Sequence, residues 1–317
     1  MERGDVRGRR VLVTGAAGFV GSNVTRALVH LGARVHAIVR PTSQVWRIED
    51  LLADLRVHCV DLADRDSLQA AVDEARPELV FHFAKHSGHP SSPALHEALT
   101  TNVLGTANLL HATARHEYRQ FVHAGSWLEY GQSQEPLSES NLPAPCTIHG
   151  ATKAAATILC QQFAREHRRS NVVLRLFSVY GHREAPARLI PSAIRAALEG
   201  VELLLTTPGC HHDWVFTEDV VDACLLASAA EGLTGEVINV GSGESSSNEA
   251  VVDAVQAVCG RPIRTRPDAY PQRPWDSPHC CADIRKAGRL LGWAPHHRLR
   301  DGIGRLASAT PRREAAN

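Results

Sequence analysis

Three regularly spaced glycines are the first residues of this chain whose type and order suggest chemistry. Gly15, Gly18 and Gly21 lie in VLVTGAAGFVGSNV (residues 11–24), between an apolar strand pattern and an apolar helical pattern. The pyrophosphate of a dinucleotide must approach backbone N–H groups at a helix N-terminus, where the helix dipole also favours negative charge. The pattern therefore predicts a dinucleotide site, and a tight turn without a ligand is the alternative. To this site we also assign Ala17, Phe19 and Val20.

The end of the second strand pattern indicates which dinucleotide binds. An NAD site usually carries an acid about 20 residues after the glycines, which binds the ribose 2′-hydroxyl. Here that place reads Val39-Arg40-Pro41-Thr42-Ser43, and the first acid is Glu49. A cation with hydroxyls suits a 2′-phosphate, so we expect NADP, held by Arg40 and Ser43, with NAD as the alternative. A solvated strand end is the other interpretation of Arg40.

Asp61 and Leu62 follow the third strand pattern and are assigned to the same site. The Asp61 carboxylate either accepts a hydrogen bond from the adenine amine or caps the helix that begins near Asp64.

Lysine is rare in this chain. The 34 basic residues comprise 31 Arg and only three Lys, at positions 85, 153 and 286. Arg replaces Lys wherever either residue serves, so a surviving Lys points weakly to chemistry that needs an ammonium, whose pKa shifts readily.

Strand and helix patterns alternate along the first 180 residues. Strands are predicted near residues 9–15, 34–40, 56–61, 78–84, 120–126 and 171–177, and helices near 18–31, 46–55, 64–76, 94–116 and 149–169. This βαβ rhythm predicts an α/β fold with a seven-stranded, doubly wound parallel sheet of Rossmann type, to which residues 236–240 return.

The pattern changes after Gly181, where prolines separate shorter elements. We expect a dinucleotide-binding domain over 1–180, which part of 213–245 rejoins, and a smaller α/β substrate lobe over 181–308. The polar stretch 309–317 is predicted to be a disordered tail.

Composition excludes several function classes. The 317 residues carry 34 Lys+Arg and 34 Asp+Glu, so no net field attracts nucleic acid or an anionic membrane. Residues 1–10 are polar and no apolar run approaches about 18 residues, which predicts neither a signal peptide nor a membrane span, and hence a cytoplasmic protein. The eight Cys show no CxxC spacing and are expected to be buried free thiols.

Further motifs connect the chain to a known family. They are TGAAGFVG (residues 14–21), Asp61-Leu62, His82-Phe83-Ala84, NVLGT (102–106), Ser126, Lys153, Val179-Tyr180-Gly181, and three later stretches at 206–220, 239–245 and 273–293. With these the chain resembles the extended short-chain dehydrogenase/reductases that modify nucleotide sugars, such as UDP-glucose 4-epimerases and 4-keto-6-deoxyhexose 4-reductases. The likeness covers about residues 9–305. It implies further cofactor contacts at Phe83, Ala84, Lys85, Asn102, Lys153, Leu176 and Phe177.

The catalytic set that the resemblance implies contains one departure. The family uses a Ser or Thr, a Tyr, and a Lys four residues after the Tyr. Ser126 and Lys153 match, but the Tyr position is His149, so the motif reads HxxxK. An imidazole starts near pKa ~6.5, and the Lys153 charge pushes it lower, so His149 is expected to be neutral and a better base than acid.

Lys85 is the other candidate for the residue that transfers the proton. It stands where the family commonly has Ala, beside the expected nicotinamide and sugar. A desolvated Lys85 near Lys153 would have a lowered pKa and could act as acid or base, or hold a substrate oxygen. A lysine that reaches out to solvent is the alternative. His86 and His89 have metal-ligand spacing but no evident third ligand, so no metal is predicted.

The resemblance also implies contacts to the substrate, a nucleoside-diphosphate sugar. Trp127-Leu128 occupies the place of the Asp-Glu pair of 4,6-dehydratases, which argues against 4,6-dehydration. His212 replaces an Arg that binds diphosphate, Arg273 keeps the other diphosphate position, and Ser178 replaces Asn. The substrate set is His86, Ser126, Trp127, His149, Ser178, Arg188, Leu189, His212, Arg273 and Asp276.

Four functions remain open at this point. An NAD(P)-dependent enzyme acting at carbon 4 of the sugar is favoured, as a 4-ketoreductase slightly ahead of a 4-epimerase with retained cofactor. A non-redox acid/base enzyme and an NADP-binding pseudoenzyme are the others. The family implies a homodimer through a four-helix contact made by the helices that contain residues 102–110 and 153–163.

Overall fold

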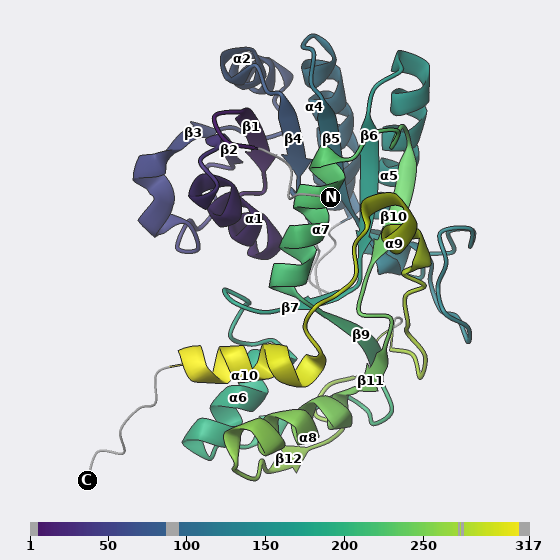
Figure 1. Cartoon of the computed structure of the whole chain (residues 1–317). Helices are drawn as coiled ribbons and strands as arrows, with labels where there is room; N and C mark the ends of the chain where they lie inside the picture. The colour runs from purple at the N-terminus through teal and green to yellow at the C-terminus, as the bar shows by residue number, and fades with distance from the viewer. Residues whose placement is uncertain (1–5, 87–94, 272, 274–275, 311–317) are drawn as a thin grey trace.

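A parallel sheet of seven strands forms the centre of the molecule (Figure 1). The computed structural model describes residues 6–86, 95–271, 273 and 276–310. The strands lie in the order β10-β6-β5-β4-β1-β2-β3, and every pair is parallel. Their bounds are β1 Arg10–Thr14, β2 Arg34–Val39, β3 Leu55–Cys59, β4 Leu79–His82, β5 Gln120–Ser126, β6 Asn171–Leu176 and β10 Glu236–Val240. The predicted α/β fold is confirmed, and the strand order reverses between β1 and β4, where ligands bind in such sheets.

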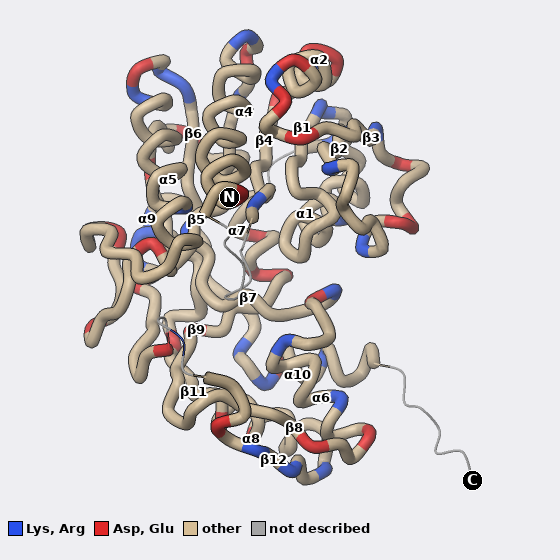
Figure 2. The backbone as a smooth tube through the Cα atoms, turned by 180° about the vertical axis from the view of Figure 1, so that it is seen from behind, with Lys and Arg blue, Asp and Glu red and all other residues tan. Residues whose placement is uncertain are grey.

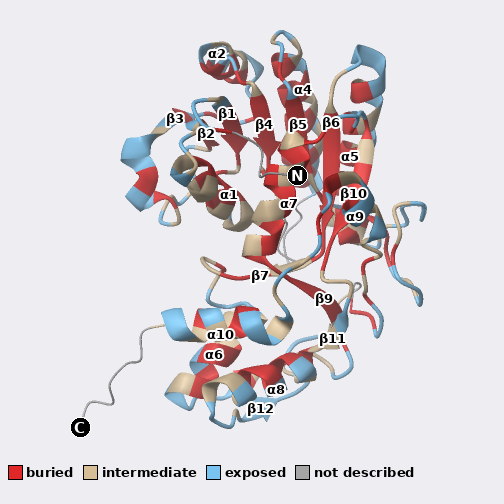
Figure 3. Ribbon diagram, viewed as in Figure 1, coloured by how far each residue is buried: buried red, intermediate tan, exposed pale blue. Residues whose placement is uncertain are grey.

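Helices cover both faces of this sheet, and its central strands are buried, whereas the edge strand β3 is largely exposed (Figure 3). Residues such as Val24, Val220 and Ala287 pack on one face and Leu68, Leu109 and Cys160 on the other. The first face carries α1 Phe19–His30, α7 Thr217–Ala229 and α9 Arg285–Leu291, and the second carries α2 Arg65–Ala75, α4 Gly105–Ala114 and α5 Ile148–His167. Aliphatic side chains fill both interfaces, as a sheet covered on two faces requires.

Two predicted helices differ from expectation. Residues 46–55 contain only a short 3₁₀ helix, η1 Glu49–Asp54, because a single residue of it, Leu51, is buried. The predicted helix at 94–116 is divided into α3 Leu95–Ala98, a π-helical segment η2 Leu99–Leu104, and α4. Such π segments often occur at functional sites, and this one carries Asn102.

A smaller lobe packs below the sheet in Figure 1. Its apolar core joins residues such as Ile190, Val251 and Ile303. It contains α6 Leu189–Glu199, α8 Asn248–Cys259, α10 Leu299–Ala309 and the short pair β8 Leu203–Leu204 and β12 Thr265–Arg266. Between the lobes lies a three-stranded sheet of β7 Ser178–Tyr180, β9 His211–Phe216 and β11 Ser245–Ser247.

The C-terminal helix, the cysteines and the surface bear on further expectations from the sequence. Helix α10 includes Ala309, the first residue of the predicted tail, and 311–317 lie outside the described residues. All eight cysteines are free, but Cys59 and Cys146 are exposed, so the expectation of buried thiols is wrong for these two. Acidic and basic residues lie beside each other on α2 and around β8, α8 and β12 (Figure 2). In the described ranges no helix is both long and apolar enough to cross a bilayer.

Candidate active site

The turn between β1 and α1 is built for an anionic ligand. Gly15 has φ +67°, and a Cβ there would lie 2.5 Å from the backbone nitrogen of Ala84, so the end of β4 packs directly on the turn. A Cβ on Gly21 would collide with the Gly15 carbonyl oxygen. Gly18 caps α1 without a side chain, and the first turn contains no acid. The N–H groups of this turn therefore face no competing carboxylate, and the site fits a dinucleotide pyrophosphate.

The residues after β2, where the cofactor ribose is expected to bind, include the cation Arg40 and the hydroxyl of Ser43. Arg40 is half-buried and makes no side-chain hydrogen bond or ion pair within the described ranges. The Ser43 N–H donates to the Arg40 carbonyl at 2.9 Å, so the backbone from Arg40 to Ser43 forms a turn.

Asp61 does not cap α2. Its carboxylate accepts from the Ala63 N–H at 2.9 Å, and Asp64 caps the helix by accepting from the Ser67 N–H at 3.2 Å. Of the two interpretations of Asp61, helix capping is therefore wrong. Its neighbour Leu62 is buried and packs against Gly105.

Asn102 holds the segment that follows β4. Its Oδ1 accepts from the His86 N–H at 2.7 Å, and its Nδ2 donates to the His86 carbonyl at 2.9 Å and to Thr152 Oγ1 at 2.9 Å. His149 Nδ1 lies 3.4 Å from the same carbonyl. The π-helical segment thereby fixes Lys85 and His86 against the start of α5, next to His149.

Lys85, His149 and Lys153 form an electropositive group. Lys85 is solvent-exposed, yet desolvation of its ammonium, with the charge of Arg188, lowers its pKa to about 8. Burial lowers the pKa of Lys153 to about 8, against the opposing effect of Glu129. Burial and then the charges of Lys85 and Lys153 lower the pKa of His149 to about 3. At neutral pH the site holds two ammonium groups and one neutral imidazole.

Ser126 ends β5 and begins the short 3₁₀ helix η3 Trp127–Glu129. Its N–H donates to Glu129 Oε1 at 2.8 Å, and its Oγ accepts from the Leu128 N–H at 3.3 Å. Glu129 is fully buried and its Oε2 lies 2.7 Å from Arg175 Nε. A buried ion pair therefore anchors the Ser126 turn and leaves its hydroxyl hydrogen available to a ligand.

The substrate side of the site centres on His212. Its Nδ1 lies 3.3 Å from Ser178 Oγ, and its ring contacts the ring of Trp127. Burial, and then Arg273 nearby, lower the pKa of His212 to about 4, so the ring is neutral.

The two predicted substrate arginines are held by acids. Arg273 donates through Nη2 to Asp276 Oδ1 at 2.8 Å, and Asp276 also accepts from the Arg273 N–H. Arg188 caps α6 just before Leu189, with its Nε 3.6 Å from Glu184 Oε1. The Asp276 carboxylate therefore orients the Arg273 guanidinium.

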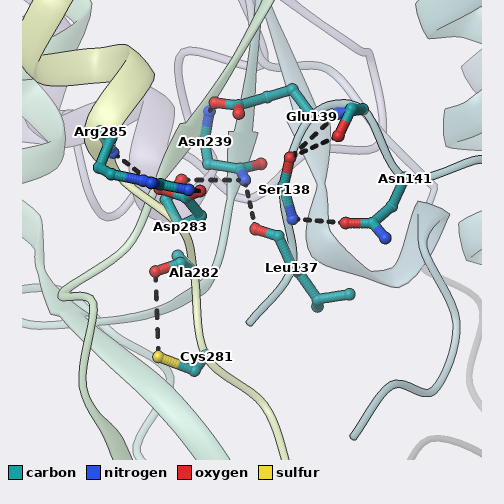
Figure 4. A network of polar contacts seen from close by, with 10 residues as sticks. Leu137, Ser138, Glu139, Asn141, Asn239, Cys281, Ala282, Asp283 and Arg285 are labelled. Carbon is teal, nitrogen blue, oxygen red and sulfur yellow. Dashed lines mark hydrogen bonds and ion pairs between the residues drawn. The ribbon is translucent and has the colours of Figure 1, made fainter. Parts of the chain in front are cut away.

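A loop between β5 and α5 connects the candidate site to the C-terminal part of the chain through hydrogen bonds (Figure 4). The Leu137 N–H donates to the Cys281 carbonyl at 2.8 Å, and the Asp283 N–H donates to the Leu137 carbonyl at 2.8 Å. Asn239 donates to the same carbonyl and accepts from the Tyr130 hydroxyl at 2.7 Å. The residues that follow β5 and β10 are thereby locked together.

Sequence analysis missed three buried ionisable residues around this site. His82 at the end of β4 and His123 in the middle of β5 pair in register and are fully buried, and a histidine inside an apolar strand pattern was the available signal. Glu184 is nearly buried with a raised pKa of about 7, caused by burial, and nothing in the sequence marks it.

Metal ligands form no group of three or more among the residues that the structure describes. His89 lies outside these residues.

Comparison with known proteins agrees with this geometry. The model of the NAD dependent epimerase/dehydratase family matches residues 11–241. The chain belongs to this family. Its resemblance to the extended short-chain dehydrogenase/reductases is confirmed, and the protein is an enzyme of the epimerase/dehydratase family.

Relatives in the epimerase/dehydratase family match over nearly the whole chain. An uncharacterized UDP-glucose epimerase of Bacillus subtilis is 28% identical over 93% of this chain and 95% of its own. A dTDP-glucose 4,6-dehydratase of Neisseria gonorrhoeae is 28% identical, with 93% of each chain covered. The solved structure of MoeE5 with UDP-glucuronic acid and NAD is 32% identical, with a TM-score of 0.82 over 92% of this chain and 96% of that one.

Proposed function

We propose that this enzyme is an NADPH-dependent 4-ketoreductase of a nucleoside-diphosphate sugar. The observation that carries the proposal is the pair of ammonium groups, Lys85 and Lys153, beside a neutral His149. Reduction of a ketone needs a proton donor at the carbonyl oxygen, and a donor with a pKa near the working pH is the effective one.

The chain's own groups have distinct roles in this proposal. Lys153 holds the cofactor ribose, and the nicotinamide, when bound, supplies a hydride. Ser126 donates its hydroxyl hydrogen to the substrate 4-oxygen, and Lys85 transfers a proton to that oxygen. His149 is uncharged and orients the sugar. An imidazole whose pKa is about 3 cannot serve as the proton donor at neutral pH.

The epimerase remains the second candidate because solved UDP-sugar 4-epimerases share this fold, among them the UDP-glucose 4-epimerase of Thermus thermophilus with NAD. An epimerase must first remove the proton of the 4-hydroxyl. A base whose conjugate acid has a pKa of about 3 accepts that proton poorly, so the neutral His149 favours the reductase.

Two further parts of the proposal concern binding. Half-buried Arg40, which has no side-chain partner among the described residues, supports NADP together with Ser43, while a solved relative is described with NAD. A homodimer through η2, α4 and α5 is supported by exposed apolar side chains, Leu104 at the end of η2 and Ile158 and Leu159 on α5.

Turnover on defined substrates tests the function. The purified enzyme is mixed with NADPH and a dTDP- or UDP-4-keto-6-deoxyhexose, and absorbance at the nicotinamide band is followed together with product analysis. We expect net oxidation of NADPH and a 4-hydroxy product, and little cofactor retained on purification. Tightly retained NAD(P)⁺, interconversion of 4-epimers and no net NADPH oxidation would establish the epimerase instead.

A further inference from the structure

The side chain of Lys153 has one polar contact in the described part of the chain. Lys153 is buried, and its Nζ lies 3.3 Å from Nε2 of His123 on β5. His123 is fully buried, and its other ring nitrogen, Nδ1, has no partner. An ammonium has three N–H donors, so the histidine takes one and two remain.

The direction of this hydrogen bond follows from charge. Burial, and then the charge of Lys153, keep the pKa of His123 well below its usual value, so the ring is neutral. A neutral imidazole has one N–H and one lone pair, and an ammonium can only donate. Nε2 therefore accepts from charged Lys153, and the ring proton sits on Nδ1 without a partner. A buried N–H without a hydrogen-bond partner costs free energy, and here the cost is offset because the other ring nitrogen, Nε2, binds Lys153.

A second histidine confines this ring without competing for it. His82 packs against His123 with ring centroids 4.9 Å apart. Thr106 donates its hydroxyl to the Asn102 carbonyl at 2.6 Å, so its oxygen accepts from His82 Nε2, and Thr14 donates to His82 Nδ1. Both ring nitrogens of His82 already have hydrogen-bond partners, so His82 only packs against the His123 ring.

Other ionisable groups face Lys153 from every side. Glu129 from η3 favours its charged form, but this carboxylate is already paired with Arg175. Lys85 after β4 opposes the charged form, and His149 on α5 is neutral. Cys160, also on α5, stays a thiol because burial raises its pKa to about 12. His123 is thus the neutral group that touches the ammonium.

We propose that His123 is the positioning residue of Lys153. Its Nε2 lone pair takes one N–H of the ammonium, directs the other two towards the cofactor ribose, and stabilises the charged lysine in a buried place. The directing role rests on the proposed function, whereas the effect on the charge of Lys153 does not.

The scarcity of lysine makes a direct test practical. Protein labelled with ¹³C at lysine Cε gives signals from only three lysines, which Lys85→Arg and Lys286→Arg variants assign. The midpoint of the Lys153 titration is followed by NMR in the wild type and in His123→Leu. We expect a midpoint near pH 8 in the wild type and a fall of about one pH unit in the variant, because a hydrogen bond to the charged form is lost.

Side-chain geometry supplies the controls. His123→Gln places an amide oxygen near the position of Nε2 and should restore most of the midpoint, whereas His123→Asn is too short and should behave like the Leu variant. His58→Leu replaces another buried strand histidine, one that contacts His36 and no lysine, and should leave the midpoint unchanged. An unchanged Lys153 midpoint in both folded variants, Leu and Asn, would overturn the proposal. If His123→Leu does not fold, the comparison of the Lys153 midpoint between His123→Gln and His123→Asn tests the proposal.

Kinetics supply the second readout. In His123→Leu the KM for NADPH should rise about tenfold, because Lys153 holds the cofactor ribose in the proposed function, while His123→Gln stays near the wild type. The NMR titration needs no turnover, so an enzyme without reductase activity would disprove the proposed function and leave the test of His123 intact.

Discussion

Lys85 is the residue on which the chemistry can be tested most directly. A proton donor must be protonated, so kcat should be constant below a pH of about 8 and fall above it. In Lys85→Met we expect kcat to fall by about 100-fold or more, with a smaller change in KM. Lys286→Met is the matched control, since Lys286 pairs with Glu236 away from this group. If kcat of Lys85→Met stays within threefold of the wild type, another group donates the proton.

Arg40 decides the cofactor in our proposal. Arg40→Ser removes the cation that faces the 2′-phosphate, so the KM for NADPH should rise about 10- to 100-fold while that for NADH stays the same. Steady-state kinetics with both cofactors measure this, and Arg34→Ser, at the exposed opposite end of β2, is the control. An equal effect on both cofactors would identify Arg40 as a strand end without a ligand.

Helices α4 and α5 carry the element-scale prediction. Leu104, at the end of η2 next to α4, and Ile158 and Leu159 on α5 are exposed at 48%, 57% and 37%, which is unusual for large apolar side chains on neighbouring helical segments. We expect a second copy to cover them, so Ile158→Asp should shift the mass measured by light scattering from dimer to monomer. Leu142→Asp changes an equally apolar residue at 86% exposure on a loop and should not. A wild-type monomer at micromolar concentration would contradict the dimer.

At the same scale, sequence patterns located most of the sheet and its helices, because buried parallel strands read as apolar runs. They could not locate the π-helical turn at Leu99–Leu104 or the loss of helix before Glu49. Both depend on contacts distant in sequence. Asn102 is held by the backbone of His86 and by Thr152, and no local pattern encodes these partners.

The whole molecule should lose stability on mild acidification. His82, His123 and His212 are buried and His149 is half-buried, and their pKa values are lowered in the fold, while in the unfolded chain they return to about 6.5. Their contribution is complete above pH 6.5 and declines as pH falls, down to about 4 for His212 and about 3 for His82 and His149, by about 1.4 kcal/mol per pH unit for each neutral ring. Glu184, with its raised pKa of about 7, and Asp213, whose pKa burial also raises, act in the opposite sense.

Thermal unfolding followed by circular dichroism measures this effect. Tm of the protein without cofactor should fall by several degrees between pH 7 and pH 5, and the slope should be shallower in His123→Leu because one such histidine is gone. A Tm that does not change over this range would show that these histidines are protonated in the fold at little cost.

The sequence by itself determined the fold class, the glycine turn that suits a dinucleotide, and the HxxxK motif with a lysine beside it. These features are local, since spacing and residue type within a few turns of chain specify them. Only the tertiary structure decided the ionisation of Lys85, Lys153 and His149, the pairing of Arg273 with Asp276, and the contact of His123 with Lys153. A parallel sheet brings the carboxyl ends of distant strands to one edge, and burial there sets each pKa, so charge and partner depend on neighbours that are remote in the chain.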